Sequence, residues 1–226
     1  MTTPDGLTAV PLKGATPADR PSRLRGVRWG VAAACGLLTC ATVCARPVSY
    51  QLDPAHTFVH FEVMHFGTST IRGRLGPISG EVVLDREAGR GEVSLQVRTG
   101  SVDTGLAVFN QRLCAADLLA CETEPLAYFV ARRLEFDGDR VKAVTGEFTL
   151  RGVSRALTLR AERFGCHTHP TLQREVCGGD FVGQVRRSDF GASFGLPFVS
   201  DAVTLRVQVE GLRVPAVEAA GSRPAP

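Results

Sequence analysis

Residues 57–66 read Thr57-Phe58-Val59-His60-Phe61-Glu62-Val63-Met64-His65-Phe66, and their character changes at every second position. The side chains of Val59, Phe61 and Val63 fall on one face, whereas His60 and Glu62 fall on the other. Successive side chains of a β-strand point to opposite faces, so a period of two is typical of a strand. This run therefore predicts a β-strand with one strongly apolar side.

Further runs of strand-forming residues follow along the chain and are separated by short polar connections. Asp137-Gly138-Asp139 stands between two of them and is a strong hairpin signal. The other expected strands cover residues 80–84, 92–98, 126–136, 141–150, 156–164, 181–190 and 202–212. About eight strands with short connections favour an all-β fold, an antiparallel meander that removes its edges by closing into a β-barrel.

Residues 105–122 interrupt this rhythm, because their leucines are scattered among polar residues without a β-branched run. We predict a short helical insert here, capped by Asp103 or Thr104 and placed to cover the mouth of the barrel. We expect one barrel domain over residues 46–213 and a disordered tail over residues 214–226.

Residues 1–45 have the features of a secretory signal peptide. Four arginines within residues 20–28 precede the apolar, uncharged run Val31–Val43, and Ala45 has the small side chain that a cleavage site prefers. The run is shorter than the ~20 apolar residues of a spanning helix. We expect cleavage near Ala45 and a periplasmic or secreted protein, and a lipoprotein anchored at Cys40 is the alternative.

The charge of the chain gives no reason to expect a nucleic-acid partner. The whole chain has a formal net charge of +3, and residues 1–45 carry the same excess, with one lysine and four arginines against two aspartates. The mature chain is therefore close to neutral. It lacks the basic surface that nucleic-acid-binding proteins present.

Four cysteines remain after the expected cleavage, namely Cys114, Cys121, Cys166 and Cys177. An even number of cysteines in an oxidising compartment predicts two disulfides. Three pairings are open. Cys114 with Cys121 and Cys166 with Cys177 is the simplest, because it joins neighbours in sequence. Free buried thiols are the alternative.

Two motifs invite an enzymatic or a metal-binding interpretation. Gly191-Ala192-Ser193-Phe194-Gly195 matches the G-x-S-x-G pattern of hydrolases, but no histidine follows Ser193, and Leu196-Pro197-Phe198 is not a helix start. His167 and His169, with the neighbouring cysteines, offer donors for Zn²⁺, but their spacing fits no standard zinc finger. We therefore expect a protein without catalytic residues, cofactor or metal.

The apolar strand faces are open to two interpretations. A barrel of about eight strands can be filled by its own side chains or can hold one ligand. A packed barrel would act through its surface, for example as a stress-response interaction protein. Composition alone does not separate these two possibilities.

Five motifs in a fixed order resemble those of the YceI family. They are Tyr50-x-Leu52-Asp53-Pro54-x-His56-Thr57 followed by Phe61-x-Val63-x-His65; Ser101-Val102-Asp103-Thr104-Gly105; Leu113 to Asp117-Leu118-Leu119 with Pro125; Gly146-x-Phe148-x-Leu150-x-Gly152-Val153; and Arg187-Ser188-Asp189-Phe190-Gly191. Each motif is weak alone, but their common order over residues 50–212 is specific. Two positions depart from the family pattern: Leu118-Leu119 replaces the usual aromatic pair, and Arg112 stands where a histidine is frequent.

The resemblance implies a lipocalin-like, extended antiparallel barrel in a bacterial, usually periplasmic protein that binds a polyisoprenoid or a similar amphiphile without catalysis. A long apolar chain gains about 0.8 kcal/mol for each buried CH₂, and a few polar groups at the mouth suffice to orient its head. The expected slot residues are Val59, Phe61, Val63, Val97 and Phe129, and the expected mouth residues are His65, Arg112, Asp117 and Arg187. Arg186 and Arg187, with Asp189 at the same strand end, also have a structural interpretation, as an arginine–carboxylate brace that stabilises the barrel rim. For a lipid carrier we further expect transient contact with the inner membrane, and we leave a homodimer open.

Overall fold

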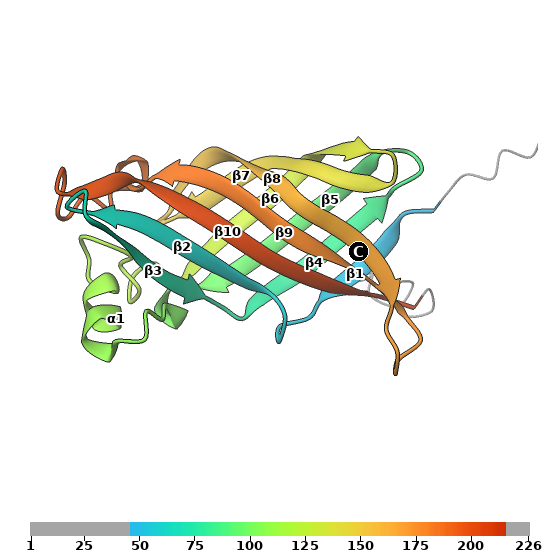
Figure 1. Ribbon diagram of the computed structural model, residues 1–226, viewed down its shortest axis with the longest axis horizontal. Coiled ribbons are helices and arrows are strands. Elements are labelled where there is room, and N and C mark those ends of the chain that lie inside the picture. Colours follow the sequence, from blue (N-terminus) through green and yellow to red (C-terminus); the bar gives the residue numbers. More distant parts are fainter. Residues whose placement is uncertain (1–45, 216–226) are drawn as a thin grey trace, which may run out of the picture. The chain divides into compact units, whose positions relative to one another are not determined.

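The computed structural model describes residues 46–215, which are built mainly of β-strands (Figure 1). The strands are β1 (Val48–Leu52), β2 (Phe58–His65), β3 (Ser69–Leu75), β4 (Ile78–Asp85), β5 (Arg90–Arg98), β6 (Leu126–Asp137), β7 (Arg140–Leu150), β8 (Val153–Thr168), β9 (Glu175–Arg186) and β10 (Val199–Arg213). Three short helices are η1 (Thr99–Ser101), α1 (Ala107–Leu113) and η2 (Arg187–Phe190), and no helix within residues 46–215 is long and apolar enough to cross a membrane. The predicted signal peptide, and the predicted tail from residue 216 onward, lie outside the described residues.

Eight strands close into an antiparallel barrel in the order β1-β4-β5-β6-β7-β8-β9-β10, because β1 pairs with both β4 and β10. Strand β10 pairs with β9 along one edge, and it is long enough to pair with two strands along its other edge. Its C-terminal part pairs with β1, and its N-terminal part pairs with β2, which in turn pairs with β3. The prediction of an all-β antiparallel barrel with a short helical insert is confirmed.

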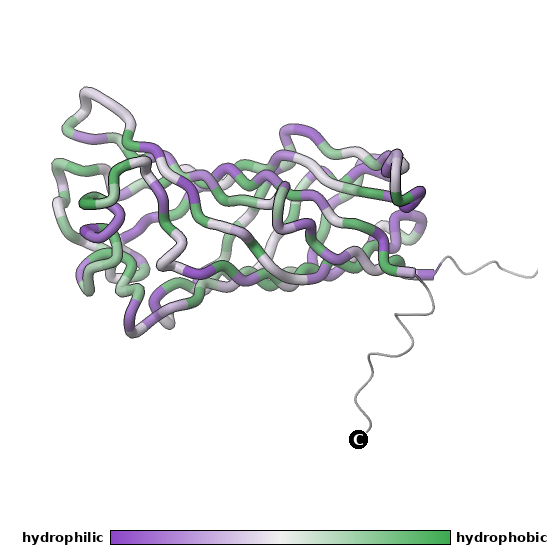
Figure 2. The backbone as a smooth tube through the Cα atoms, turned by 90° about the horizontal axis from the view of Figure 1, so that it is seen from below, coloured by the Kyte–Doolittle hydropathy of each residue, from purple (hydrophilic) through white to green (hydrophobic). Residues whose placement is uncertain are grey.

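Strand β6 shows how the sequence pattern orients side chains. Ala127, Phe129 and Ala131 are buried, and the intervening Tyr128 and Val130 are exposed. Hydrophobic and hydrophilic residues alternate in the same way along much of the barrel wall (Figure 2). The inward-facing side chains of the strands therefore meet in one continuous hydrophobic core.

Tight turns and long strands give the barrel its elongated form. Arg151 and Gly152 join β7 to β8 with φ angles of 53° and 68°, which is the conformation of a type I′ hairpin turn. Gly138, within the predicted hairpin signal, also has a positive φ of 62°. Strand β8 has 16 residues, and it rises roughly 50 Å at ~3.3 Å per residue.

The structure corrects several predicted boundaries. The strand expected at residues 181–190 begins at Glu175, and its last four residues form η2, which ends at Gly191 with a φ of 75°. The sequence pattern also misses β3, whose serine, threonine, glycine and arginine residues lack a hydrophobic alternation. Helix α1 begins after Leu106, not after Asp103 or Thr104.

Candidate functional site

The barrel interior is hollow beneath the helical insert. A cavity of about 190 Å³ lies there, and its wall is almost entirely apolar. Every strand from β2 to β10 contributes to this wall, and the insert adds Leu113, Leu118 and Leu119. The inward-facing side chains therefore do not fill the barrel completely, which argues against a solidly packed interior.

A second void of about 70 Å³ continues the cavity away from the insert. Four side chains line both voids: Leu95, Phe129, Leu159 and Val207. Tyr50 and Cys177 line only the second void. The two adjacent apolar voids lie one after the other along the barrel, and we refer to them together as the slot.

All five predicted slot residues line the larger cavity. They are Val59, Phe61, Val63, Val97 and Phe129. The ring of Phe61 is accommodated by Gly73, its partner on β3, because a Cβ atom at Gly73 would lie only 2.4 Å from Cζ of the ring. A contact between these residues and a ligand stays a prediction.

Arg187 is the only charged side chain of the described residues in the cavity wall, and it is 7% exposed. Its guanidinium donates four hydrogen bonds of 2.7–2.8 Å to backbone carbonyls. The acceptors belong to Ala192, Phe194, Val199 and Ser200. Burial lowers the pKa of Arg187, and the charge of Asp201 opposes this effect. These four bonds engage four of the five N–H groups of the guanidinium.

The expected arginine–carboxylate brace is present, and it joins Arg186 to Asp201 rather than to Asp189. Arg187 binds carbonyls, and its neighbour Arg186 makes the ion pair, with a distance of 3.1 Å from Nε to Oδ2 of Asp201. Asp201 also accepts hydrogen bonds from the amide and hydroxyl of Ser188. Although burial alone would raise the pKa of Asp201, these hydrogen bonds hold it below its usual value.

The other three mouth candidates lie outside the cavity wall. Arg112 and Asp117 pair with each other through two hydrogen bonds of 2.7 and 2.8 Å, which lower the pKa of Asp117. His65 ends β2, and its ring packs edge-on against Phe66 with centroids 4.7 Å apart. The structure thus places these three residues around the covered end of the barrel, and their contact with a ligand stays a prediction.

The insert is held over the cavity as a lid, which we define as residues 103–124. The disulfide Cys114–Cys121 closes a loop within it. Arg151, from the β7–β8 turn, donates from Nη1 to the carbonyls of Ala116 and Leu118 at 2.6 and 2.8 Å, and from Nε to that of Phe190 at 2.9 Å. Arg151 thus attaches the middle of the lid to the barrel, and a backbone bridge between Arg74 and Asp103 attaches its start.

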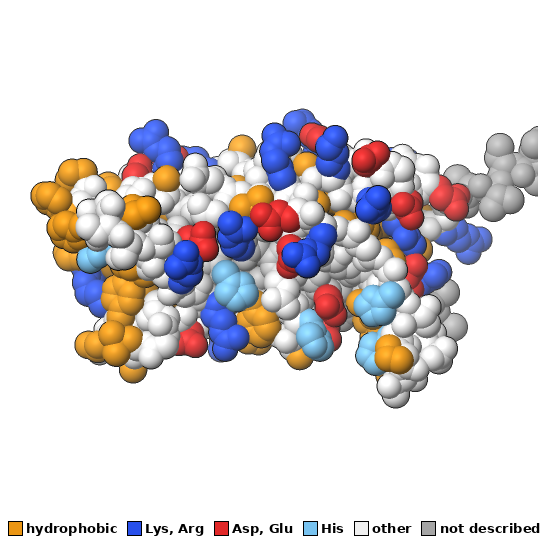
Figure 3. Space-filling model, viewed as in Figure 1, with side chains coloured by type: hydrophobic (Ala, Val, Ile, Leu, Met, Phe, Trp, Pro, Cys, Tyr) orange, Lys and Arg blue, Asp and Glu red, His pale blue; other side chains and the backbone are white. Residues whose placement is uncertain are grey.

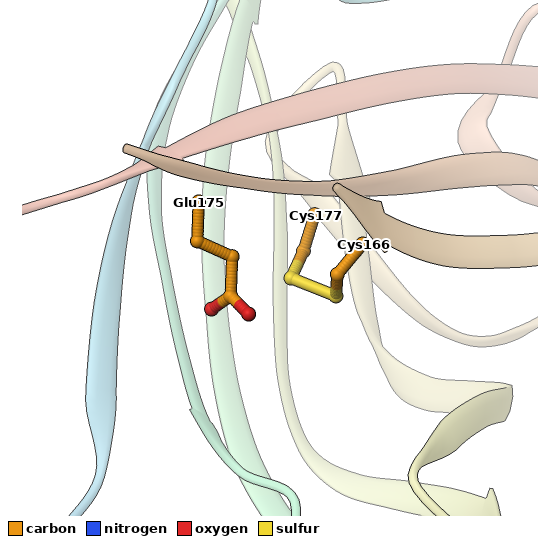
Figure 4. Close-up of side chains that lie close together, drawn as sticks. All are labelled: Cys166, Glu175 and Cys177. Atoms are coloured by element: carbon orange, nitrogen blue, oxygen red, sulfur yellow. A yellow bond between two sulfur atoms is a disulfide. The ribbon is translucent and has the colours of Figure 1, made fainter. Parts of the chain in front are cut away.

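The second disulfide joins Cys166 of β8 to Cys177 of β9, which are direct partners in the ladder. Both predicted disulfides are confirmed. Glu175 lies beside this disulfide (Figure 4) and accepts hydrogen bonds from the hydroxyl of Tyr50 at 2.5 Å and from Arg86 at 2.8 Å. Burial and the contact with Glu175 raise the pKa of Tyr50 to about 12.

Within residues 46–215, only Cys166, Glu175 and Cys177 bring three potential metal-ligand atoms close together, all within 4.8 Å. Their donors are already engaged, the two sulfurs with each other and the carboxylate with Tyr50 and Arg86. The zinc alternative required His167 and His169, which lie outside this group. His169 instead accepts the backbone N–H groups of its own turn.

Ser193 is exposed in the turn that leads from η2 into β10. A hydrolase nucleophile in the G-x-S-x-G motif stands between a strand and a helix. Ser193 therefore does not stand in the strand–turn–helix context of that motif. The neighbouring residues Phe190 and Ala192 face the cavity instead.

Sequence reasoning missed a large part of the cavity wall on β7 and β8. Phe148 and Leu150 line the cavity from β7, and Leu157 and Leu159 line it from β8. These residues alternate with polar neighbours, so the same period of two that identified β2 would have found them. The lid residues carry no such period.

Comparison with known proteins agrees with this architecture. A family model described as a YceI-like domain matches residues 50–211. The chain belongs to the YceI family. Protein YceI of Escherichia coli O157:H7 is 30% identical over 172 residues, which cover 75% of this chain and 89% of that protein. A UPF0312 protein of Pseudomonas aeruginosa (strain LESB58) is 29% identical over the same coverage.

Solved structures share the fold of this YceI-family chain. BcnA of Burkholderia cenocepacia superposes with a TM-score of 0.59 at 20% identity, covering 70% of this chain and 98% of that one. A polyisoprenoid binding domain from Saccharophagus degradans superposes with a TM-score of 0.56 at 19% identity, covering 74% and 99%. At these identities the likeness establishes the fold alone.

Proposed function

We propose that this protein is a non-enzymatic carrier or sink for a long apolar lipid, an isoprenoid or a similar amphiphile, which it holds inside the barrel. The observation that carries this proposal is the elongated apolar slot with one charged side chain in its wall. The description of the Saccharophagus degradans domain as polyisoprenoid-binding supports the same class of ligand.

The slot suits a linear chain that gains its affinity from burial. Each CH₂ group that leaves water contributes about 0.8 kcal/mol, so about ten groups supply 8 kcal/mol before the costs of association. The remaining N–H donor of Arg187 suits an oxygen acceptor on the lipid head, such as a quinone carbonyl, a hydroxyl or a phosphate. This orientation puts the head under the lid and the chain deeper in the barrel.

A periplasmic location is part of the proposal. The basic and apolar segments of residues 1–45 support export with cleavage near Ala45, and the two disulfides suit an oxidising compartment. An isoprenoid chain is insoluble in water, so its passage through the periplasm requires a shielded interior of this kind.

A binding titration tests the proposal. Delipidated protein comprising residues 46–226 is mixed with an isoprenoid quinone delivered from ethanol, and binding is compared between Phe61→Asp and His60→Asp. Phe61 lines the cavity, and His60 is its outward-facing neighbour on β2. We expect Phe61→Asp to lose the quinone and His60→Asp to retain it. Retention by a folded Phe61→Asp variant would remove this residue from the slot, and no uptake by the unaltered protein would refute the proposed function.

A further inference from the structure

Hydrophobic side chains are exposed at the end of the barrel that carries the lid. Nine large hydrophobic residues in the described part of the chain are exposed, and six of them, with exposed fractions of 46–67%, lie beside the β2–β3 turn, in the η2–β10 loop or at the start of α1. These six form the apolar rim: Met64, Phe66, Leu106, Val108, Phe194 and Phe198. Hydrophobic side chains gather at this end in Figure 3, at the left of the view.

The most prominent part of the apolar rim is a pair of aromatic rings. Phe66 and Phe198 are stacked with centroids 5.4 Å apart and an angle of 15° between the rings. The amide of Phe66 also donates to the carbonyl of Phe198 at 2.8 Å, which ties the two segments together. Both rings are more than half exposed, so the pair adds little to the core and remains available to a partner.

Residues of the apolar rim are close neighbours, along the chain, of residues in the cavity wall. Val63 precedes Phe66 by three residues and faces the cavity, Ala192 faces it beside Phe194, and Leu113 faces it from the helix that follows Leu106. The apolar rim therefore borders the cavity at the end of the barrel that carries the lid.

The charged groups beside the apolar rim are largely neutralised by one another. Arg72 pairs with Glu62 at 3.1 Å, and Arg112 pairs with Asp117. Arg112 also lies over the ring of Phe194, with Cζ 3.9 Å from its centroid. The rim therefore fits an apolar phase better than an anionic surface.

We propose that the apolar rim docks the protein on a lipid bilayer, with the Phe66–Phe198 pair inserted at the level of the head groups, so that lipid enters beneath the lid. This inference rests on the proposed function, since the position of the apolar rim beside the cavity is what favours a bilayer over a protein partner. The residues of the apolar rim lie on separate segments around the lid. A stable protein interface instead covers a continuous patch of roughly 800 Å² on each partner.

Sedimentation with phosphatidylcholine vesicles tests the docking surface. We compare the protein comprising residues 46–226 with the rim variant F66S/F198S and with the control V130S/L172S, whose residues are 47% and 51% exposed but lie outside the apolar rim. We expect the vesicle partition coefficient to fall about tenfold or more in the rim variant and by less than about twofold in the control. Added phosphatidylglycerol should change the partition little, because the neighbouring charges are paired.

Quinone uptake separates this inference from the proposed function. The rim variant should take up an isoprenoid quinone from ethanol like the unaltered protein, but should extract it more slowly from vesicles. Failure of uptake in every variant would refute the proposed function, whatever the vesicle result. A rim variant that sediments like the unaltered protein, or a control that loses as much binding, would overturn the docking surface. A dimer that F66S/F198S dissociates would show that a second copy covers the apolar rim.

Discussion

Replacing Ala127 by leucine separates a hollow barrel from a packed one. Ala127 is 3% exposed on β6 and lines the cavity beneath the lid. Leucine at this position extends about three further carbon atoms into the cavity. The substitution should therefore stabilise the protein without ligand and weaken ligand binding at the same time, and a simple folding defect cannot produce that combination.

The magnitude follows from the apolar groups involved. Three carbons at about 0.8 kcal/mol each, less a rotamer entropy of about 0.5–1 kcal/mol for leucine, raise the free energy of unfolding by roughly 1.5 kcal/mol. If the new side chain displaces about three CH₂ groups of the ligand, the affinity falls by roughly 2.4 kcal/mol, or about 50-fold. The substitution thus raises the stability of the protein without ligand and lowers its affinity for the ligand.

Urea unfolding of the delipidated protein and quinone titration measure these two quantities. Val130→Leu is the matched control, because Val130 lies on the same strand and is exposed on the outside of the barrel. A loss of about 1–3 kcal/mol of stability in Ala127→Leu would indicate overpacking, and would refute the hollow interior at this position. Higher stability with unchanged affinity would place the ligand elsewhere.

Three more predictions follow from the polar contacts around the slot. Arg187→Met leaves four carbonyls without their donor and should lower the free energy of unfolding by about 3 kcal/mol or more, as measured by urea denaturation; a loss below about 1 kcal/mol would show that these hydrogen bonds matter little. In Tyr128→Phe, Tyr50 is the only tyrosine, and ultraviolet titration should give its pKa as about 12, not 10.0. Because folding raises this pKa, the associated stabilisation is complete below pH 10 and is lost as the pH rises through about 12; a midpoint near 10 would contradict the burial of Tyr50 and its contact with Glu175. Arg151→Ala should speed amide hydrogen exchange in the lid by about tenfold and leave β6 and β7 unchanged, and equal exchange in the two proteins would show that Arg151 does not hold the lid.

The sequence predicts the slot residues on β2 because its hydrophobic period is unbroken. Val59, Phe61 and Val63 alternate with polar neighbours, and burial of one sheet face is the simplest result of that pattern. Strand β3 is not predicted, because part of its role is to leave space for a side chain of the neighbouring strand. Gly73 leaves room for Phe61, and such a cross-strand requirement is not visible in the local pattern.

Other parts of the site depend on contacts between distant segments. Arg187 sits at a predicted strand end, but its acceptors belong to the η2–β10 loop and to the first two residues of β10, and the local pattern does not show these contacts. The apolar residues of a filled barrel and of a hollow one are of the same types. Only the three-dimensional arrangement shows that space remains between Phe129 and the lid.

Mass spectrometry of organic extracts tests the central claim most directly. The mature protein is purified from the periplasm of its own host without detergent, and its lipid content is compared with that of Phe61→Asp purified in parallel. We expect a long-chain isoprenoid or a similar amphiphile in stoichiometric amount with the unaltered protein, and its loss from the folded variant. An extract without lipid, together with no uptake of added polyprenyl lipid, would contradict the account.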